Sequence, residues 1–248
     1  MPLSYAELDR TQDVPHETTA NAVVLLSGGQ DSTTCFYDAL NRYDAVAAVS
    51  VDYGQRHRVE LALAAETAAN AGVPHRVFDL PVLQQLAGAS LTNRLIENTV
   101  EGAPASEGWH AEHGLPPSFV PGRNLLFFTV AAAYGIPRGF HTLVSGVCET
   151  DRAGYPDCRE EFVLEMRSAI RLGMDEPDFH IDTPLMHLSK AETWGMAARL
   201  GIMDEIVENT ATCYEGDRDH FHEWGYGCGV CGACTERARG YTDWILKS

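Results

Sequence analysis

A glycine-rich stretch near the N-terminus has the residue types that hold a phosphate. Residues 27–32 read Ser-Gly-Gly-Gln-Asp-Ser and follow an apolar run that ends at Leu26. The two glycines leave the main chain bare and allow positive φ, so successive N–H groups can point at one anion. A helix predicted over 33–41 adds the positive end of its dipole. The sequence therefore predicts a phosphate site formed by residues 26–33.

The side chains of this stretch indicate how the phosphate is held. No lysine follows the glycines, so the lysine-bearing P-loop pattern is absent. Ser27, Ser32 and Thr33 offer hydroxyl donors instead, while Asp31 would repel a bare phosphate and is better suited to a bound Mg²⁺. The alternative is an ordinary strand-to-helix turn in which Asp31 or Ser32 is the helix N-cap.

Two cations elsewhere in the chain are candidates for contact with the same anion. Arg123 lies in the turn before a helix predicted over 125–134 and is a second cation for the phosphates; the alternative is a surface arginine. Lys190 follows Ser189, the predicted N-cap of another helix, and Ser189 and Glu192 have the S-x-x-E spacing of a capping box. A cation is disfavoured at the positive end of a helix unless an anion lies near. We therefore expect Lys190 to contact phosphate, the alternative being a solvated lysine.

The C-terminal segment concentrates soft metal ligands. The chain has seven cysteines, an odd number that argues against a complete disulfide framework, and four lie close together: Cys213, Cys228, Cys231 and Cys234. Four thiolates predict a tetrahedral Zn²⁺ site with no open position, hence a structural one that stabilises the segment. An iron–sulfur cluster or unliganded thiols are the alternatives, and His220 or His222 could substitute as ligands.

The elements that must position these residues alternate between strands and helices. Strands are predicted over 22–26, 45–52, 75–79 and 142–147, and helices over 33–41, 59–70, 125–134, 160–172 and 190–200. This order predicts an α/β fold with a doubly wound, mostly parallel sheet of Rossmann type. Ligands collect at the carboxyl ends of such strands, so the loops at 27–32, 52–57 and 148–159 should converge. Residues 88–117 are predicted to form a long loop.

Length and charge limit the classes of function. The 248 residues are 45% hydrophobic, enough for one sizeable α/β core. The 35 acidic and 18 basic residues give a net charge of −17, which opposes binding of a nucleic-acid backbone. No apolar run approaches the ~20 residues of a membrane span, and residues 1–21 lack the features of a secretion signal. We expect a cytoplasmic enzyme that acts on small molecules.

Residues 27–32 resemble the pyrophosphatase loop (PP-loop) of the N-type ATP pyrophosphatases, which cleave ATP to AMP and pyrophosphate while adenylating a substrate. That resemblance implies an adenine nucleotide alpha hydrolase-like fold. With further blocks, the chain is similar to the 7-cyano-7-deazaguanine synthase family over about residues 22–240, in that family's order. The blocks are 27–35, 52–58, 119–124, 146–151, 154–159, 183–186, 190–194 and the four cysteines.

This resemblance implies an ATP-dependent ligase of queuosine or archaeosine precursor synthesis. It would convert 7-carboxy-7-deazaguanine and ammonia to 7-cyano-7-deazaguanine through adenylated intermediates, releasing AMP and pyrophosphate, with zinc bound, Mg²⁺ accompanying ATP, and a homodimeric assembly. The alternatives are another adenylating pyrophosphatase that thiolates or amidates a tRNA base, and a zinc-ribbon module that binds nucleic acid.

Residue roles follow from the resemblance and from the chemistry of the ligands. Catalytic roles are expected for Asp31, Ser32, Arg123 and Lys190. ATP is expected on Leu26, Ser27, Gly28, Gly29, Gln30, Asp31, Ser32 and Thr33, with Asp52 or Gln55 at the adenosine. The deazaguanine ring needs hydrogen-bond acceptors and stacking faces, and its candidates are Phe119, Asn124, Asp151, Tyr155 and Asp157. The expected division is a flexible tail (1–20), a PP-loop ATP-binding α/β domain (21–205) and a small helical zinc-binding segment (206–248).

Overall fold

The computed structural model describes residues 20–55, 57–86, 108–149 and 155–247. Nearly all of the predicted tail 1–20, most of the predicted loop 88–117 and Asp151 lie outside the described residues. Within them, the centre of the fold is a sheet of five strands in the order β3-β2-β1-β4-β5. The strands are β1 Asn21–Leu25, β2 Ala45–Asp52, β3 His75–Asp79, β4 Thr142–Val144 and β5 His180–Asp182.

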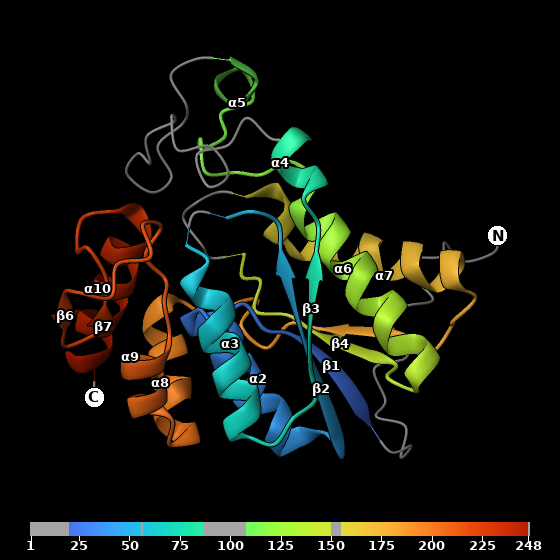
Figure 1. Cartoon of the computed structure of the whole chain (residues 1–248), viewed down its shortest axis with the longest axis horizontal. Coiled ribbons are helices and arrows are strands. Elements are labelled where there is room, and N and C mark those ends of the chain that lie inside the picture. The colour runs from blue at the N-terminus through green and yellow to red at the C-terminus, as the bar shows by residue number, and fades with distance from the viewer. Residues whose placement is uncertain (1–19, 56, 87–107, 150–154, 248) are drawn as a thin grey trace.

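Every neighbouring pair in this sheet is parallel, and helices cover both faces (Figure 1). The helices are α2 Gln30–Arg42, α3 Val59–Asn70, α4 Val82–Leu86, α5 Gly108–Glu112, α6 Arg123–Gly135, α7 Glu160–Met174, α8 Lys190–Leu200, α9 Met203–Asn209 and α10 Gly232–Ile245. Along the chain, β2 and β3 are added on one side of β1, and β4 and β5 are then added on the other side. The predicted doubly wound parallel α/β fold is confirmed.

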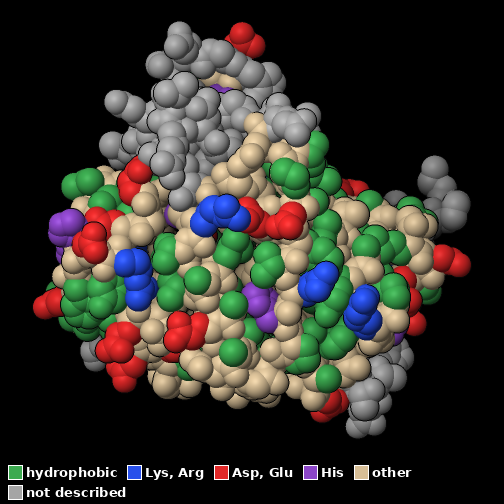
Figure 2. Space-filling view, viewed as in Figure 1, with side chains coloured by type: hydrophobic (Ala, Val, Ile, Leu, Met, Phe, Trp, Pro, Cys, Tyr) green, Lys and Arg blue, Asp and Glu red, His purple; other side chains and the backbone are tan. Residues whose placement is uncertain are grey.

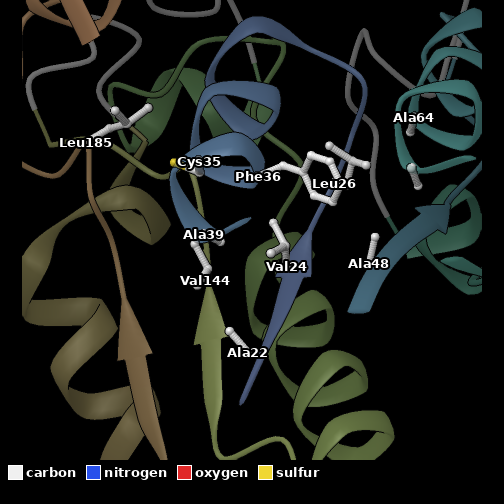
Figure 3. Packing of buried hydrophobic residues seen from close by; sticks show 11 residues of the cluster. Ala22, Val24, Leu26, Cys35, Phe36, Ala39, Ala48, Ala64, Val144 and Leu185 are labelled. Carbon is white, nitrogen blue, oxygen red and sulfur yellow. The ribbon is translucent and has the colours of Figure 1, made fainter. Parts of the chain in front are cut away.

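The strand β1 is apolar throughout because both of its faces are buried. Ala22 and Val24 pack with α2 and α3 residues in one hydrophobic cluster, and Figure 3 shows them facing Phe36 and Ala39 of α2. Val23, between them, packs in a second cluster with α6 and α7. Alternate side chains of a strand point to opposite faces, so a central parallel strand reads as a continuous apolar run.

Several elements match the sequence predictions and others depart from them. The strands over 45–52 and 75–79 and the helix over 59–70 have the predicted bounds. The helix α2 begins at residue 30, earlier than the predicted 33. The strand β4 ends at residue 144, before the predicted 147. Beyond it, Gly146 packs against the start of α2, where a Cβ would lie 3.1 Å from the carbonyl carbon of Asp31. The helical turn α5 lies within the predicted loop 88–117.

The C-terminal segment forms the predicted small helical subregion. A two-stranded antiparallel hairpin, β6 Phe221–His222 and β7 Gly225–Tyr226, precedes α10. The helix α10 packs on α8 through Trp194, which is fully buried and has its ring centroid 5.1 Å from that of Tyr241. The predicted boundary between 205 and 206 falls inside α9. Among the described residues, none of the helices is both long and apolar enough to cross a lipid bilayer.

Candidate active site

A cavity of about 290 Å³ lies at the carboxyl end of the sheet, where the chain order reverses between β1 and β4. Ligands of doubly wound folds bind at this switch point. The three loops predicted to converge all contribute to its lining, for example through Ser27, Gln55 and Tyr155. The helices α3, α6, α8 and α10 contribute further polar lining residues. This volume is suited to a small-molecule site.

The loop between β1 and α2, called the phosphate loop below (residues 26–33), is ordered by its own serines. The Ser27 and Ser32 hydroxyl oxygens lie 2.9 Å apart, and the Ser32 hydroxyl oxygen accepts a hydrogen bond from the Ser27 N–H at 3.1 Å. The N-cap of α2 is Gly29, and no side chain caps the helix. Asp31 and Ser32 lie inside the helix, so the alternative in which one of them is the N-cap is wrong. An uncapped helix start beside a cavity is suited to an anion.

Gly28 holds this loop against α3. Its φ is +88°, and a Cβ there would lie 2.1 Å from the carbonyl oxygen of Glu60. On its other side, the Ala211 N–H donates to the Gly28 carbonyl oxygen at 3.0 Å. Only glycine fits both the left-handed conformation and the close approach. The phosphate loop is therefore supported by the first turn of α3 and by the chain around residue 211.

Lys190 and Asp31 form an ion pair at the wall of the cavity. The Lys190 Nζ lies 2.7 Å from Asp31 Oδ2, and both residues are among those that line the cavity. Lys190 is the first residue of α8, directly after Ser189, whose side chain forms the predicted capping box with Glu192. The negative charge of Asp31 compensates the cation at the positive end of α8. The alternative of a freely solvated lysine is therefore wrong.

Arg123 lies in the cavity wall at the start of α6, so the alternative of a surface arginine is wrong. Its guanidinium carbon lies 5.5 Å from the centre of the Tyr155 ring. Burial acts to lower the pKa of Arg123, but the neighbouring Tyr53 and Asp157 favour the cation and raise that pKa above its ordinary value. Arg123 is thus a fixed positive charge facing the cavity.

Of the residues predicted to bind the deazaguanine ring, the four that the structure describes form two layers. Asn124 and Tyr155 line the cavity. Behind them, the Asn124 amide nitrogen donates to the Asp157 carbonyl oxygen at 3.0 Å, and the Phe119 ring lies 5.8 Å from the Tyr155 ring. Asp157 is 5% exposed and its carboxylate accepts from the Asn124 main-chain N–H. Burial raises the pKa of Asp157, with Arg123 opposing that shift.

The residues predicted to bind the nucleotide divide into those that line the cavity and those that do not. Leu26, Ser27, Gly29, Asp31 and Ser32 line the cavity, whereas Gly28, Gln30 and Thr33 belong to the same loop without being among the lining residues. Gln55 lines the cavity, and its side-chain oxygen accepts from the Tyr53 N–H at 3.0 Å. Asp52 is not a lining residue and pairs with Arg58.

A histidine–glutamate pair in the cavity was not anticipated. His57 Nε2 lies 3.2 Å from Glu60 Oε2, both side chains are largely buried, and both line the cavity. Burial lowers the pKa of His57, but the Glu60 carboxylate and a backbone hydrogen bond with Tyr214 together raise it, so the pKa lies above its ordinary value. The sequence offered only one signal, the i, i+3 spacing of the two residues at the start of a predicted helix.

The C-terminal segment contributes lining residues that sequence reasoning also missed. They are Thr212, Tyr214, Ala233, Glu236 and Arg237, and two further cysteines, Cys148 and Cys158, line the cavity from other loops. The available signal was proximity in sequence, since Thr212 and Tyr214 flank one predicted metal ligand. The cysteine segment therefore borders the cavity itself.

The four predicted metal ligands lie together. The sulfur atoms of Cys213, Cys228, Cys231 and Cys234 all lie within 4.8 Å of one another. Ideal tetrahedral zinc thiolates have sulfur separations of about 3.8 Å, so the donor set fits such an ion. A hydrogen bond from the Cys231 thiol contributes most to lowering the pKa of Cys213, which favours a thiolate. The substitute ligands hydrogen-bond elsewhere, His220 with Asp217 and His222 with the Gly227 carbonyl oxygen.

Known proteins match this chain over most of its length. The family model described as queuosine biosynthesis protein QueC matches residues 21–245. Relatives called 7-cyano-7-deazaguanine synthase include one from Polaromonas naphthalenivorans, 48% identical over 89% of this chain and 93% of that protein. Another, from Caulobacter vibrioides, is 46% identical over 94% of this chain and 96% of its own. A solved structure described as a predicted subunit of tRNA methyltransferase from Methanocaldococcus jannaschii superposes with a TM-score of 0.45 at 19% identity, covering 72% of this chain and 74% of that one.

Proposed function

The chain belongs to the queuosine biosynthesis protein QueC family, and from that premise we infer that it converts 7-carboxy-7-deazaguanine and ammonia to 7-cyano-7-deazaguanine with ATP. It is a ligase that makes a queuosine precursor. One observation carries the mechanism proposed below. The uncapped start of α2, the Lys190–Asp31 pair and Arg123 all face one cavity at the switch point of the sheet.

The chemistry of nitrile formation explains why a phosphate site is needed. Converting a carboxylate to a nitrile removes two oxygens, one at the amide step and one at the nitrile step. Hydroxide and oxide are poor leaving groups, so each oxygen must first be activated. We propose that each is adenylated, which uses two ATP and releases AMP and pyrophosphate each time.

The proposed catalytic residues stabilise the departing pyrophosphate and align the reacting carboxylate. The main-chain N–H groups of the phosphate loop bind the β- and γ-phosphates, with hydroxyls from Ser27 and Ser32. Lys190 and Arg123 place positive charge at the same cavity wall. Asp31 is the proposed Mg²⁺ ligand, and the ion when bound would neutralise phosphate charge.

The substrate ring is proposed to lie toward α6 and the Tyr155 loop. Tyr155 and Asn124 line the cavity there and would stack on the ring and hydrogen-bond to it. Phe119 and Asp157 support those two side chains through the contacts described above. Asp151, outside the described residues, remains a candidate acceptor, and Gln55 is the candidate for the adenosine.

The four-cysteine cluster is proposed to hold one Zn²⁺. Four sulfur atoms at mutual distances under 4.8 Å suit a closed tetrahedral site, which supports a structural role. Binding would stabilise the segment 206–248 against the α/β domain 21–205, the two parts into which we propose that the chain divides.

The proposed partners are the small-molecule substrates alone, with the enzyme in the cytoplasm as a homodimer. The net charge of −17 supports the exclusion of nucleic acid. On the face drawn in Figure 2, the described Lys and Arg side chains form separate spots among apolar and acidic ones. A groove for a phosphate backbone would instead need clustered cations.

A direct assay tests the proposed activity. Purified protein incubated with ATP, ammonium and 7-carboxy-7-deazaguanine should yield 7-cyano-7-deazaguanine, measured by mass spectrometry. Omitting ATP or ammonium should abolish the nitrile. Activity on a tRNA base with no nitrile formed from the free acid would contradict the proposal in favour of a tRNA-modifying pyrophosphatase.

A further inference from the structure

Arg237 of α10 is a buried cation beside the cavity. The residue is 1% exposed, and it is among those that line the cavity. Its Nε donates to the Trp224 carbonyl oxygen at 2.8 Å, and its Nη2 donates to the Ile206 carbonyl oxygen at 2.6 Å. Its Nη1 donates to the hydroxyls of Thr210 and Thr212, each at 2.9 Å. The guanidinium thus joins α9, the hairpin and the chain at 210–212.

The charge of this side chain has no direct carboxylate partner in the part of the chain that the structure describes: its hydrogen bonds go to carbonyls and hydroxyls, and it forms no ion pair there. Burial lowers the pKa of Arg237 to about 10. A buried unpaired charge is costly and requires hydrogen bonds to compensate. No neutral side chain offers four N–H donors in one planar group, so these four acceptors require the guanidinium, and its charge lies at the wall of the cavity that is proposed to bind ATP.

The hydrogen bonds of Arg237 lead directly to the phosphate loop. Ala211 lies between the two threonines that Arg237 binds, and its N–H donates to the Gly28 carbonyl oxygen at 3.0 Å. The backbone of Ala211 also touches Gly29: a Cβ on that glycine would lie 3.4 Å from the Ala211 carbonyl oxygen. Displacing residues 210–212 would therefore displace the loop that is proposed to bind the phosphates.

The same side chain is anchored to the cysteine cluster from two directions. Arg237 lies one helical turn after Cys234 on α10. Thr212, which it binds, is covalently adjacent to Cys213. A metal ion that fixes those two cysteines would fix both the backbone that bears Arg237 and the residue that Arg237 holds.

We propose that Arg237 is a positioning residue that couples the four-cysteine cluster to the phosphate loop. With the cluster filled, α10 and Cys213 are fixed, Arg237 holds 210–212 in place, and the Ala211 N–H orients Gly28 for the phosphates. The inference rests on the proposed function in that the loop binds ATP. It adds that the metal site, which has no proposed role in the chemistry itself, sets the affinity of the loop for that ligand.

Equilibrium binding of ATP to the full-length chain, without the acid substrate, tests this coupling. Arg237→Gln should retain one zinc per chain and bind ATP 10-fold to 100-fold more weakly than the wild type. Arg237→Lys keeps the charge and loses the forked geometry, so its ATP affinity should lie between those of the wild type and Arg237→Gln. Arg199→Gln, on the exposed side of α8, is the control and should bind like the wild type.

Zinc removal separates coupling from a general loss of stability. Removing zinc with a chelator should weaken ATP binding of the wild type by about the same factor as the Arg237→Gln substitution. Chelation should not weaken ATP binding of Arg237→Gln any further, because zinc removal and the substitution break the same connection between the cysteine cluster and the phosphate loop. Wild-type affinity in zinc-loaded Arg237→Gln, or equal additional losses on chelation in both proteins, would overturn the proposal. So would failure of both Arg237 variants to fold with zinc bound, since the residue would then be structural only.

The ATP-binding measurement also distinguishes a failure of this inference from a failure of the proposed function. Wild-type protein that binds ATP but makes no nitrile would refute the assigned reaction and still allow the coupling to be measured. Nitrile formation with unchanged ATP affinity in Arg237→Gln would refute the coupling alone.

Discussion

At the scale of single residues, the site is defined by charges that are unusual for their positions. Lys190 stands at the positive end of α8, and the sequence indicated from this alone that an anion must lie near. The structure identifies one such anion as Asp31, 159 residues away in the chain. The pair itself could not be predicted, since nothing local links the two residues. His57 and Glu60 are only three residues apart, but their burial arises from the surrounding fold and could not be predicted from that spacing.

Gly28 gives the sharpest test of the phosphate loop. Gly28→Ala would place a Cβ 2.1 Å from the Glu60 carbonyl oxygen and force a non-glycine residue to φ +88°, a conformation that costs about 1–3 kcal/mol. Because the clash is with backbone, the loop must move away from α3. We expect ATP affinity, measured by calorimetry, to fall by about 100-fold or more.

Gly72→Ala is the matched control for that substitution. Gly72 follows α3 at φ +68°, so alanine suffers the same conformational strain, yet nothing lies within 4 Å of the added Cβ. This variant should lose about 1–3 kcal/mol of stability from that strain and keep wild-type ATP affinity. Equal affinities in the two variants would show that the close contact at Gly28 is not needed for the ligand.

At the scale of elements, the residues at a helix end help to predict the helix as much as the periodicity within it does. The capping box at Ser189 was predicted and is present, with the Ser189 hydroxyl accepting from the Glu192 N–H at 3.3 Å. Most elements without a predicted counterpart are short, for example β5, α4 and α9 with three, five and seven residues; the exception is α10, a 14-residue helix whose bounds were not predicted. A short segment shows too little periodicity to identify, and its conformation is set by the neighbours it packs against.

The cap should contribute measurably to stability. Ser189→Ala removes the acceptor for Glu192 and should cost about 1 kcal/mol, lowering the melting temperature by roughly 2–4 °C. Ser168→Ala is the control, because Ser168 lies inside α7, where its hydroxyl donates to the Leu164 carbonyl oxygen. Alanine favours the helix interior, so the control should be neutral or slightly stabilising. Thermal unfolding that ranks the two variants the other way would contradict a stabilising role for the cap.

At the scale of the whole molecule, the parallel sheet explains why the place of the cavity could be predicted from the sequence. Loops after β1, β2 and β4 meet because all these strands point the same way, so knowing the strands was enough to expect their convergence. The contribution of the C-terminal segment was not accessible in that way. Its path back to the cavity depends on α10 packing against α8, a long-range contact among Trp194, Tyr241 and Trp244 that no local pattern specifies.

The fate of the γ-phosphate tests the central claim, that the phosphate loop binds the β- and γ-phosphates as one leaving group. ATP labelled at the γ-position would be turned over with the acid substrate and ammonium, and the products separated by chromatography. The account predicts that all label leaves as pyrophosphate, with AMP formed in equal amount. Label released directly as orthophosphate with ADP would contradict it.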